Sequence, residues 1–175
     1  MTRMTFSFRR DGLVVGPEPR DLRFATSMLK IAFSDYDALR RHGEESYPHE
    51  CCGILLGRVE GDSRFVHAVI RCTNAREDAP QTHYEIDPRE LIRAQRDARE
   101  RDLEVVGFYH SHPDHAAVWS RTDLEEAHWI GCSYVITAVE NGKAMQTNSF
   151  ALAGTMEEDK AFAEERLVVE PGNQR

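Results

Sequence analysis

The spacing of apolar and polar residues predicts a chain in which strands and helices alternate irregularly. Residues 104–109 are mostly β-branched, aromatic or small, which predicts a buried strand running into His110 and His112. Gly61-Asp62 and Asn141-Gly142 indicate two hairpin turns, and the second dipeptide favours a two-residue turn. On these grounds we expect strands at 29–33, 51–59, 63–72, 82–86, 104–112, 133–140 and 144–152.

Capping signals predict where three helices begin. Ser34, followed by acidic residues, opens a helix that we expect to end near Ser46. Asp87 stands before a proline and supplies a cap, and Glu90 completes a capping box. Ser120 is a good N-cap for a short helix at 122–130. The inward side of the middle helix is marked by Leu91, Ala94, Gln95 and Ala98.

The two ends of the chain admit several interpretations. Residues 160–169 fit a strand or a helix, and the β-branched end of this run favours a strand. In residues 1–27, apolar residues alternate around Asp11-Gly12, which is a hairpin signal. We interpret this N-terminal extension as an extra hairpin, a partner-binding arm, or leader sequence upstream of a start at Met28, and these alternatives stay open. The domain is therefore placed at 28–169, with a C-terminal tail at 170–175.

Composition predicts one globular domain, because 175 residues that are 41% hydrophobic bury one sizeable core and leave little room for two. The net charge of −8 argues against nucleic acid or an anionic membrane as the main partner. The sequence has no apolar run near the roughly 20 residues that span a bilayer and no signal-peptide core, so we expect a cytoplasmic protein. The cysteines are then expected to be reduced thiols packed in the core: Cys51, Cys52, Cys72 and Cys132.

Three residues form a candidate metal site. His110 and His112 point to the same side of the predicted strand because side chains on a strand repeat every two residues. Asp123 follows in the first turn of a separate helix. Two imidazoles and one carboxylate suit zinc and leave its fourth tetrahedral position free, as in catalytic sites. A His-x-His pair taken alone is more often ordinary packed or surface histidine, so the wider motif decides between the two interpretations.

The motif is His-Ser-His, seven residues, Ser, two residues and Asp, formed here by His110, His112, Ser120 and Asp123. It resembles the signature of the JAMM metalloproteases, the active branch of the MPN-domain family. Upstream, the segment 47–57 is similar to the one in which that family places its catalytic glutamate, and Glu50 falls at that position. The resemblance extends over about 28–169 to the compact bacterial members, although Trp119 stands where many relatives have proline. It implies an α/β (α+β) fold, a single MPN domain with a curved mixed sheet packed by helices.

The resemblance also implies a function. It is hydrolysis of a peptide or isopeptide bond after the C-terminal Gly-Gly of a ubiquitin-like or sulfur-carrier protein, for example releasing cysteine or another adduct. One Zn²⁺ per chain would be held by His110, His112 and Asp123, with Glu50 moving the proton of the attacking water and Ser120 stabilising the oxyanion.

Several alternatives to this function remain open. They are a non-catalytic MPN scaffold, a general peptidase and a DNA-repair relative, and the acidic balance gives the last no support. Asp114 and His115 lie near the motif, in reach of substrate or a ligand histidine, but are not expected to be ligands. The residues that bind substrate are not assigned, and the oligomeric state stays open, with a homodimer as one alternative.

Overall fold

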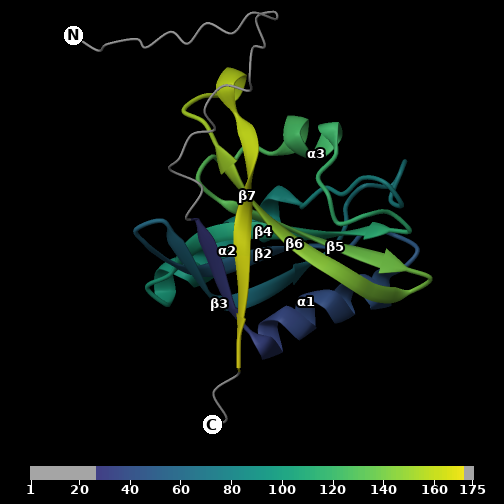
Figure 1. Cartoon of the computed structure of the whole chain (residues 1–175), viewed down its shortest axis with the longest axis horizontal. Helices are drawn as coiled ribbons and strands as arrows, with labels where there is room; N and C mark the ends of the chain where they lie inside the picture. Colours follow the sequence, from purple (N-terminus) through teal and green to yellow (C-terminus); the bar gives the residue numbers. More distant parts are fainter. Residues whose placement is uncertain (1–26, 172–175) are drawn as a thin grey trace, which may run out of the picture.

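The computed structural model describes residues 27–171. The hairpin expected around Asp11-Gly12 lies outside these residues and stays a prediction. Figure 1 shows the elements in the colours of the sequence, with labels on all of them except β1 and η2. The elements are β1 (Met28–Ala32), α1 (Phe33–Ser46), β2 (Cys52–Glu60), β3 (Ser63–Cys72), α2 (Pro88–Glu100), β4 (Glu104–Pro113), α3 (Arg121–Glu126), β5 (Ser133–Glu140), β6 (Lys143–Ala153), the 3-10 helix η2 (Glu157–Asp159) and β7 (Ala161–Glu170).

The strands form one mixed sheet that closes into a barrel, in the order β1-β3-β2-β4-β5-β6-β7. β1 pairs in parallel with β3 and β7, and β4 with β5, while the other neighbours are antiparallel. β7 closes the barrel by pairing along 161–165 with β6 and along 166–170 with β1. In Figure 1 it is the yellow strand that runs down the middle of the view. The expected α+β fold with a curved mixed sheet is confirmed, and the curvature goes as far as closure.

The apolar core lies on both sides of β2. Cys51 and Leu55 pack with residues of β1 and α1 in one cluster, whereas Cys52 and Ile54 pack with residues of α2 and β4 in another. This separation follows from strand alternation, since neighbouring side chains face opposite sides of a sheet. The four cysteines are buried and free, as expected, and burial raises the pKa of the Cys51 thiol to about 12. They serve packing.

One predicted helix start and one predicted capping box need correction. Helix α1 begins at Phe33, with Ala32 as its N-cap and no side-chain cap, so Ser34 lies inside the first turn. The last residue of β1, Ala32, pairs with β7, and the helix starts as soon as the chain leaves the sheet. Asp87 caps α2 as predicted, but Glu90 does not complete a capping box, because its carboxylate accepts from the backbone N–H of Thr73.

Two other predicted elements are shorter in the structure. The range 82–86 is not a strand and contributes only an isolated bridge between Ile86 and Asn74. The Asn74 side chain bonds backbone groups of this segment, which removes them from strand pairing. The helix expected at 122–130 ends at Glu126. The Lys160 ammonium donates to the carbonyls of residues 125 and 127, each at 2.9 Å, and so covers the end of this short helix. The strand favoured over helix at 160–169 is present as β7.

A buried ion pair fastens β7 to the rest of the barrel. Arg64 of β3 donates to a carboxylate oxygen of Glu165 at 2.8 Å, and the Glu165 side chain is fully shielded from solvent. Ser27 and Ser149 donate to the same carboxylate at 2.8 and 2.5 Å. Arg64 also donates to the carbonyl of Gly131 at 2.8 Å. The pair therefore has hydrogen-bond partners on both sides, which a buried charge needs in order to be tolerated.

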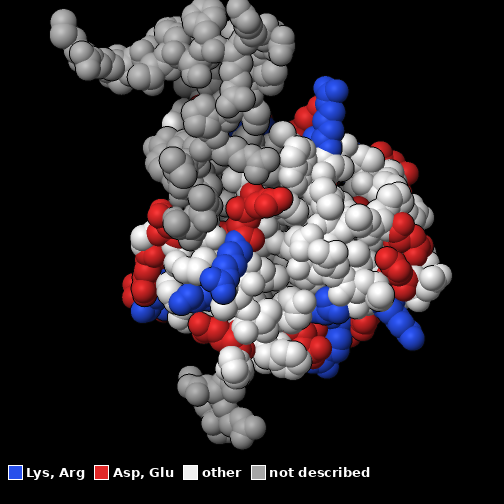
Figure 2. Space-filling view, in the orientation of Figure 1, with Lys and Arg blue, Asp and Glu red and all other residues white. Residues whose placement is uncertain are grey.

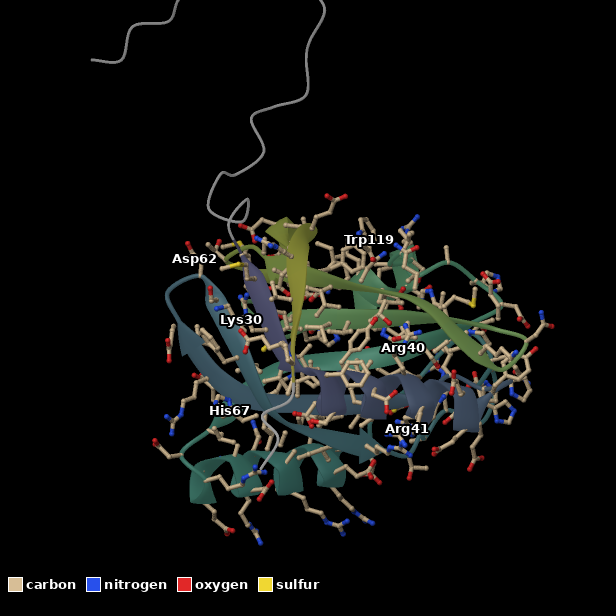
Figure 3. The ribbon with its side chains drawn as sticks, turned by 60° about the horizontal axis from the view of Figure 1, so that its bottom comes forward. Lys30, Arg40, Arg41, Asp62, His67 and Trp119 are labelled. Carbon is tan, nitrogen blue, oxygen red and sulfur yellow. The ribbon has the colours of Figure 1, made fainter. Side chains whose placement is uncertain are left out.

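The surface combines charges of both signs. Figure 2 shows acidic and basic side chains interspersed around an uncharged central area on this face. Arg40 of α1 reaches β6, where its guanidinium donates to the carbonyls of Ala144 and Met145 at 2.6 and 2.9 Å (Figure 3). This contact ties the helix to the rim of the barrel. None of the helices between residues 27 and 171 has both the length and the apolar character to cross a membrane.

Candidate metal centre and catalytic pocket

The two histidines of the motif lie on β4, a strand flanked by β2 and β5. His110 pairs with Cys52 on one side and with Ile136 on the other, so the backbone that carries it is held in the sheet from both edges. Both imidazoles project from the same face, and their Nε2 atoms lie 3.0 Å apart. The histidines are buried. The strand therefore presents two nitrogen donors at a fixed spacing.

Asp123 is brought to these histidines by the start of α3. Its carboxylate oxygens lie 3.2 Å from His110 Nε2 and 3.5 Å from His112 Nε2. Ser120 caps the helix: its hydroxyl accepts from the Asp123 backbone N–H at 3.1 Å, and its own N–H donates to the Asp123 carboxylate at 2.5 Å. This reciprocal capping box fixes the aspartate with its carboxylate toward the imidazoles.

Further contacts orient the imidazoles. His112 Nδ1 lies 2.9 Å from the carbonyl of Ala116, so this nitrogen carries the proton and donates, and Nε2 is left as the acceptor. Tyr84 stacks on the His110 ring with centroids 4.6 Å apart. Burial lowers the pKa of His110, which favours the neutral form that binds metal. Burial alone would raise the pKa of Asp123, but the imidazoles of His110 and His112 beside the carboxylate outweigh burial and hold that pKa well below its usual range.

The donor set fits a zinc ion. One ligand atom from each of His110, His112 and Asp123 lies within 4.8 Å of the others, and no other such group occurs in residues 27–171. Imidazole nitrogen and carboxylate oxygen are both ligands of Zn²⁺, and three protein ligands leave one tetrahedral position for water or substrate. The hydrogen bond from His112 Nδ1 to the Ala116 carbonyl fixes the tautomer of this imidazole. Such a bond is typical of a metal-binding histidine.

Glu50 stands just before β2, in the residues that connect α1 to the sheet. Its position follows from its neighbours: the Cys51 N–H donates to the Ser111 hydroxyl at 2.9 Å, and the Ser111 N–H donates to the Cys51 carbonyl at 3.2 Å. Ser111 is the residue between the two histidines, so the backbone of Glu50 is tied to the strand that carries them. The side chain is buried, and this burial raises the pKa of the Glu50 carboxyl to about 8.

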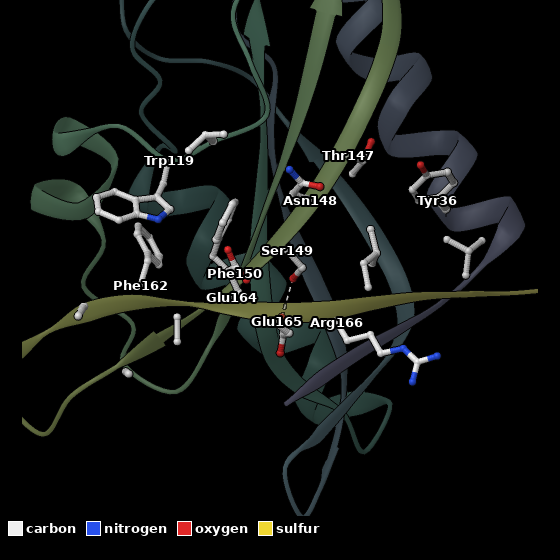
Figure 4. Close-up of a pocket in the computed structure, with 16 residues that line it drawn as sticks. Tyr36, Trp119, Thr147, Asn148, Ser149, Phe150, Phe162, Glu164, Glu165 and Arg166 are labelled. Carbon is white, nitrogen blue, oxygen red and sulfur yellow. Dashed lines mark hydrogen bonds between the residues drawn. The ribbon is translucent and has the colours of Figure 1, made fainter. Parts of the chain in front are cut away.

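Glu50, His112 and Ser120 line the same cavity of about 470 Å³. Gln81, Thr82 and His83 form another part of its wall, and Val118 and Trp119 another. A larger groove of about 1250 Å³ lies beyond Trp119, between β6 and β7 (Figure 4). Val118 and Trp119 line both hollows, and the Trp119 ring packs against Phe162 at 5.6 Å between centroids. The Trp119 indole therefore lies between the cavity and the groove.

A comparison of the sequence with protein families identifies the family of this chain. Residues 34–152 match the model of Prok-JAB, the prokaryotic homologs of the JAB domain. The chain belongs to the Prok-JAB family. The matched range includes Glu50, both histidines and Asp123, and so contains all four residues of the candidate centre.

Named relatives of this Prok-JAB chain include peptidases. A desampylase from Haloferax volcanii is 36% identical over 115 residues, covering 63% of this chain and 81% of the relative. A CysO-cysteine peptidase from Mycobacterium tuberculosis is 31% identical over 149 residues, covering 85% of this chain and 96% of the relative. Among solved structures, a protein from Salinibacter ruber is 38% identical with a TM-score of 0.62, covering 82% of this chain and 92% of that chain. The resemblance to JAMM and MPN proteins is thus confirmed at the level of the family.

Sequence reasoning missed several residues that hold the centre of the Prok-JAB domain. Ser111 carried a weak signal, a hydroxyl in a buried strand on the side opposite the histidines. Ala116 acts through its backbone carbonyl and Tyr84 through a ring contact across the fold, so neither had a signal in spacing. Asp114 is not among the grouped ligands; its carboxylate accepts from Tyr47 Oη at 2.8 Å and from a backbone N–H at 2.9 Å. His115 lines the pocket.

Proposed function

We propose that this Prok-JAB chain is a zinc-dependent hydrolase that cleaves the peptide or isopeptide bond after the C-terminal Gly-Gly of a ubiquitin-like or sulfur-carrier protein. The observation that carries the proposal is that His110, His112 and Asp123 form one group of possible metal ligands, while the buried Glu50 lines the same pocket as His112. A scaffold protein has no use for this set. A Glu near a three-ligand zinc site is the combination that hydrolytic zinc enzymes use.

His110, His112 and Asp123 would hold the ion. When bound, Zn²⁺ lowers the pKa of a coordinated water to roughly 7 and polarises a carbonyl oxygen, which supplies a nucleophile and an electrophile at neutral pH. The chain's own contribution is proton transfer by Glu50. Burial raises the pKa of this carboxyl to about 8 in the ion-free chain, and a nearby cation would bring it down toward neutrality. A carboxyl poised near neutral pH accepts a proton from water and then delivers it to the leaving amine.

Ser120 supports the attacked carbonyl. Its hydroxyl oxygen accepts from the Asp123 N–H, which leaves the hydroxyl proton to donate to the oxyanion that develops in the pocket. The residue also caps α3, so one side chain serves the helix and the reaction. Its place at the pocket wall, next to Trp119, favours this dual role.

The relatives support the choice of substrate. Their names describe a desampylase, a CysO-cysteine peptidase and, in Thermus thermophilus, a probable TtuB-protein conjugate cleaving protease. Two of these names describe cleavage of cysteine from CysO and cleavage of TtuB-protein conjugates, and we propose a substrate of this kind, a ubiquitin-like or sulfur-carrier protein, for this chain. A Gly-Gly tail is unbranched and reaches a pocket that a folded surface does not enter. Little activity is therefore expected on general protease substrates.

Glu50→Gln tests the proposal. The variant should keep about one zinc per chain and its fold but lose on the order of a hundredfold or more in turnover, the usual size of a general acid–base contribution. The assay follows a ubiquitin-like carrier extended beyond Gly-Gly by mass spectrometry. Glu140→Gln, the same change at an exposed residue of β5, is the matched control and should cleave normally. Full activity of Glu50→Gln would remove Glu50 from the mechanism, and rapid digestion of casein with an untouched carrier panel would instead indicate a general peptidase.

A further inference from the structure

The loop between β3 and α2, residues 73–87, is organised around one side-chain amide. Asn74 Nδ2 donates to the carbonyls of Glu50 and His83 at 3.2 and 3.0 Å. Asn74 Oδ1 accepts from the backbone N–H groups of Arg76 and Glu85 at 3.0 and 3.1 Å. Both donors and both lone pairs of the amide are therefore used, which is the full capacity of an asparagine side chain.

This loop contacts the candidate centre at three places. Asn74 holds the carbonyl of Glu50, and the Glu50 N–H donates to the carbonyl of Pro80 at 2.7 Å, so both backbone groups of Glu50 are bound by the loop. Tyr84, next to the His83 that Asn74 binds, stacks on the ligand His110. Gln81, Thr82 and His83 form part of the pocket wall.

We infer that Asn74 is a positioning residue that sets Glu50 against the metal ligands, and this inference rests on the proposed function. The backbone of Glu50 has no strand partner at its own position, because β2 begins at Cys52. Its orientation is fixed instead by Ser111 through Cys51 on one side and by the loop on the other. If the loop contact is lost, the carboxyl moves relative to the attacked carbonyl, and displacements of about 1 Å cost up to a hundredfold in rate.

Only an asparagine fits this position. An aspartate has the same shape, but an oxygen that only accepts replaces the amide NH2 and its two donors. This oxygen then faces the carbonyl oxygens of Glu50 and His83. A serine keeps a single donor, and an alanine keeps none. Asn74→Asp is therefore the sharpest perturbation, because it alters hydrogen bonding with almost no change in volume.

The experiment is a double-mutant cycle on the full-length, zinc-loaded chain. Asn74→Asp, Glu50→Gln and the double variant are assayed for kcat and KM on a ubiquitin-like carrier whose Gly-Gly terminus bears a fluorogenic aminocoumarin amide. Zinc content is measured for each. Gln146→Glu, the same amide-to-carboxylate change at an exposed residue of β6, is the matched control and should leave kcat unchanged.

Asn74→Asp is expected to retain zinc and lose roughly tenfold to a hundredfold in kcat. In the Glu50→Gln background the same substitution should cost less than about threefold, because a residue that acts through Glu50 has little left to position. Equal losses in both backgrounds would overturn the inference and leave Asn74 a purely structural residue, as would an unchanged kcat. Asn74→Ser serves the same cycle if the aspartate does not fold, with a smaller expected loss. Should Glu50→Gln itself keep full turnover, the proposed function fails and the positioning role with it.

Discussion

Glu50 should make the ion-free protein less stable at neutral pH than its amide variant. A carboxyl ionises in the unfolded chain near its ordinary pKa of 4.5, whereas burial raises the pKa of Glu50 to about 8 in the fold. Between these values the folded chain binds more protons than the unfolded chain. Stability is therefore fully present below about pH 4.5 and is lost as the pH rises toward 8. Glu50→Gln removes this dependence while keeping the shape of the side chain.

The size of the effect follows from the two pKa values. At about pH 5 the cost of burying the carboxyl is about 1 kcal/mol, and at about pH 7 it reaches about 3 kcal/mol, taking 1.36 kcal/mol per pKa unit. The gain of Glu50→Gln over the parent should therefore grow by about 2 kcal/mol over this range. Water that reaches the carboxyl through the pocket would reduce both values together.

The measurement is urea unfolding in EDTA, so that no cation offsets the carboxylate, for parent and variant at several pH values. Glu140→Gln is the control, since an exposed carboxylate should change stability by less than about 0.5 kcal/mol across the range. A Glu50→Gln gain that stays constant from pH 5 to 7 would refute the reasoning. A variant less stable than the parent at pH 7 would do so more strongly, because it would mean that the folded chain favours the ionised form.

Three further outcomes are expected. Asp123→Ala should purify with far less than one zinc per chain by metal analysis, because only the two imidazoles remain to bind the ion. A full zinc content would reject the ligand assignment. Removing zinc from the parent with EDTA should lower the melting temperature, and added zinc at about 100 times its Kd should restore about 2.7 kcal/mol; a melting temperature indifferent to zinc would contradict a bound ion. Arg64→Met should cost about 3 kcal/mol in chemical unfolding, because it leaves the Glu165 carboxylate buried without its cation. The exposed Arg166→Met is its control, and equal small losses in both would show that the buried pair is not important for stability.

Much of the fold could be predicted from the sequence because the signals for these elements depend on neighbouring residues. The β-branched and aromatic residues before His110, the Asn141-Gly142 turn and the Ser120 cap each depend on a few adjacent positions, and each element is present in the structure. The motif spacing likewise placed the two histidines on one strand and Asp123 in the first turn of a helix. Such features need no knowledge of distant partners.

The remaining features depend on contacts between segments far apart in the sequence. The short range 82–86 has the composition of a strand, but the Asn74 side chain takes its backbone groups. The end of α3 is set by Lys160, which lies more than thirty residues further along the chain. Barrel closure also had no local signal, because β1 and β7 pair from opposite ends of the described chain. Periodicity does not encode such contacts.

Closure by β7 has a consequence for how the protein folds. Ser27 donates a hydrogen bond to Glu165 of β7, and the two residues are 138 positions apart. The pairing of β7 with β1, which closes the barrel, therefore forms only after a long loop has been ordered. Contacts of such high sequence separation slow folding. During synthesis, β2, β4 and α3, which surround the candidate centre, leave the ribosome before β7 does. We therefore expect barrel closure by β7 to be the rate-limiting step of folding, after the segments that carry the candidate ligands have been synthesised.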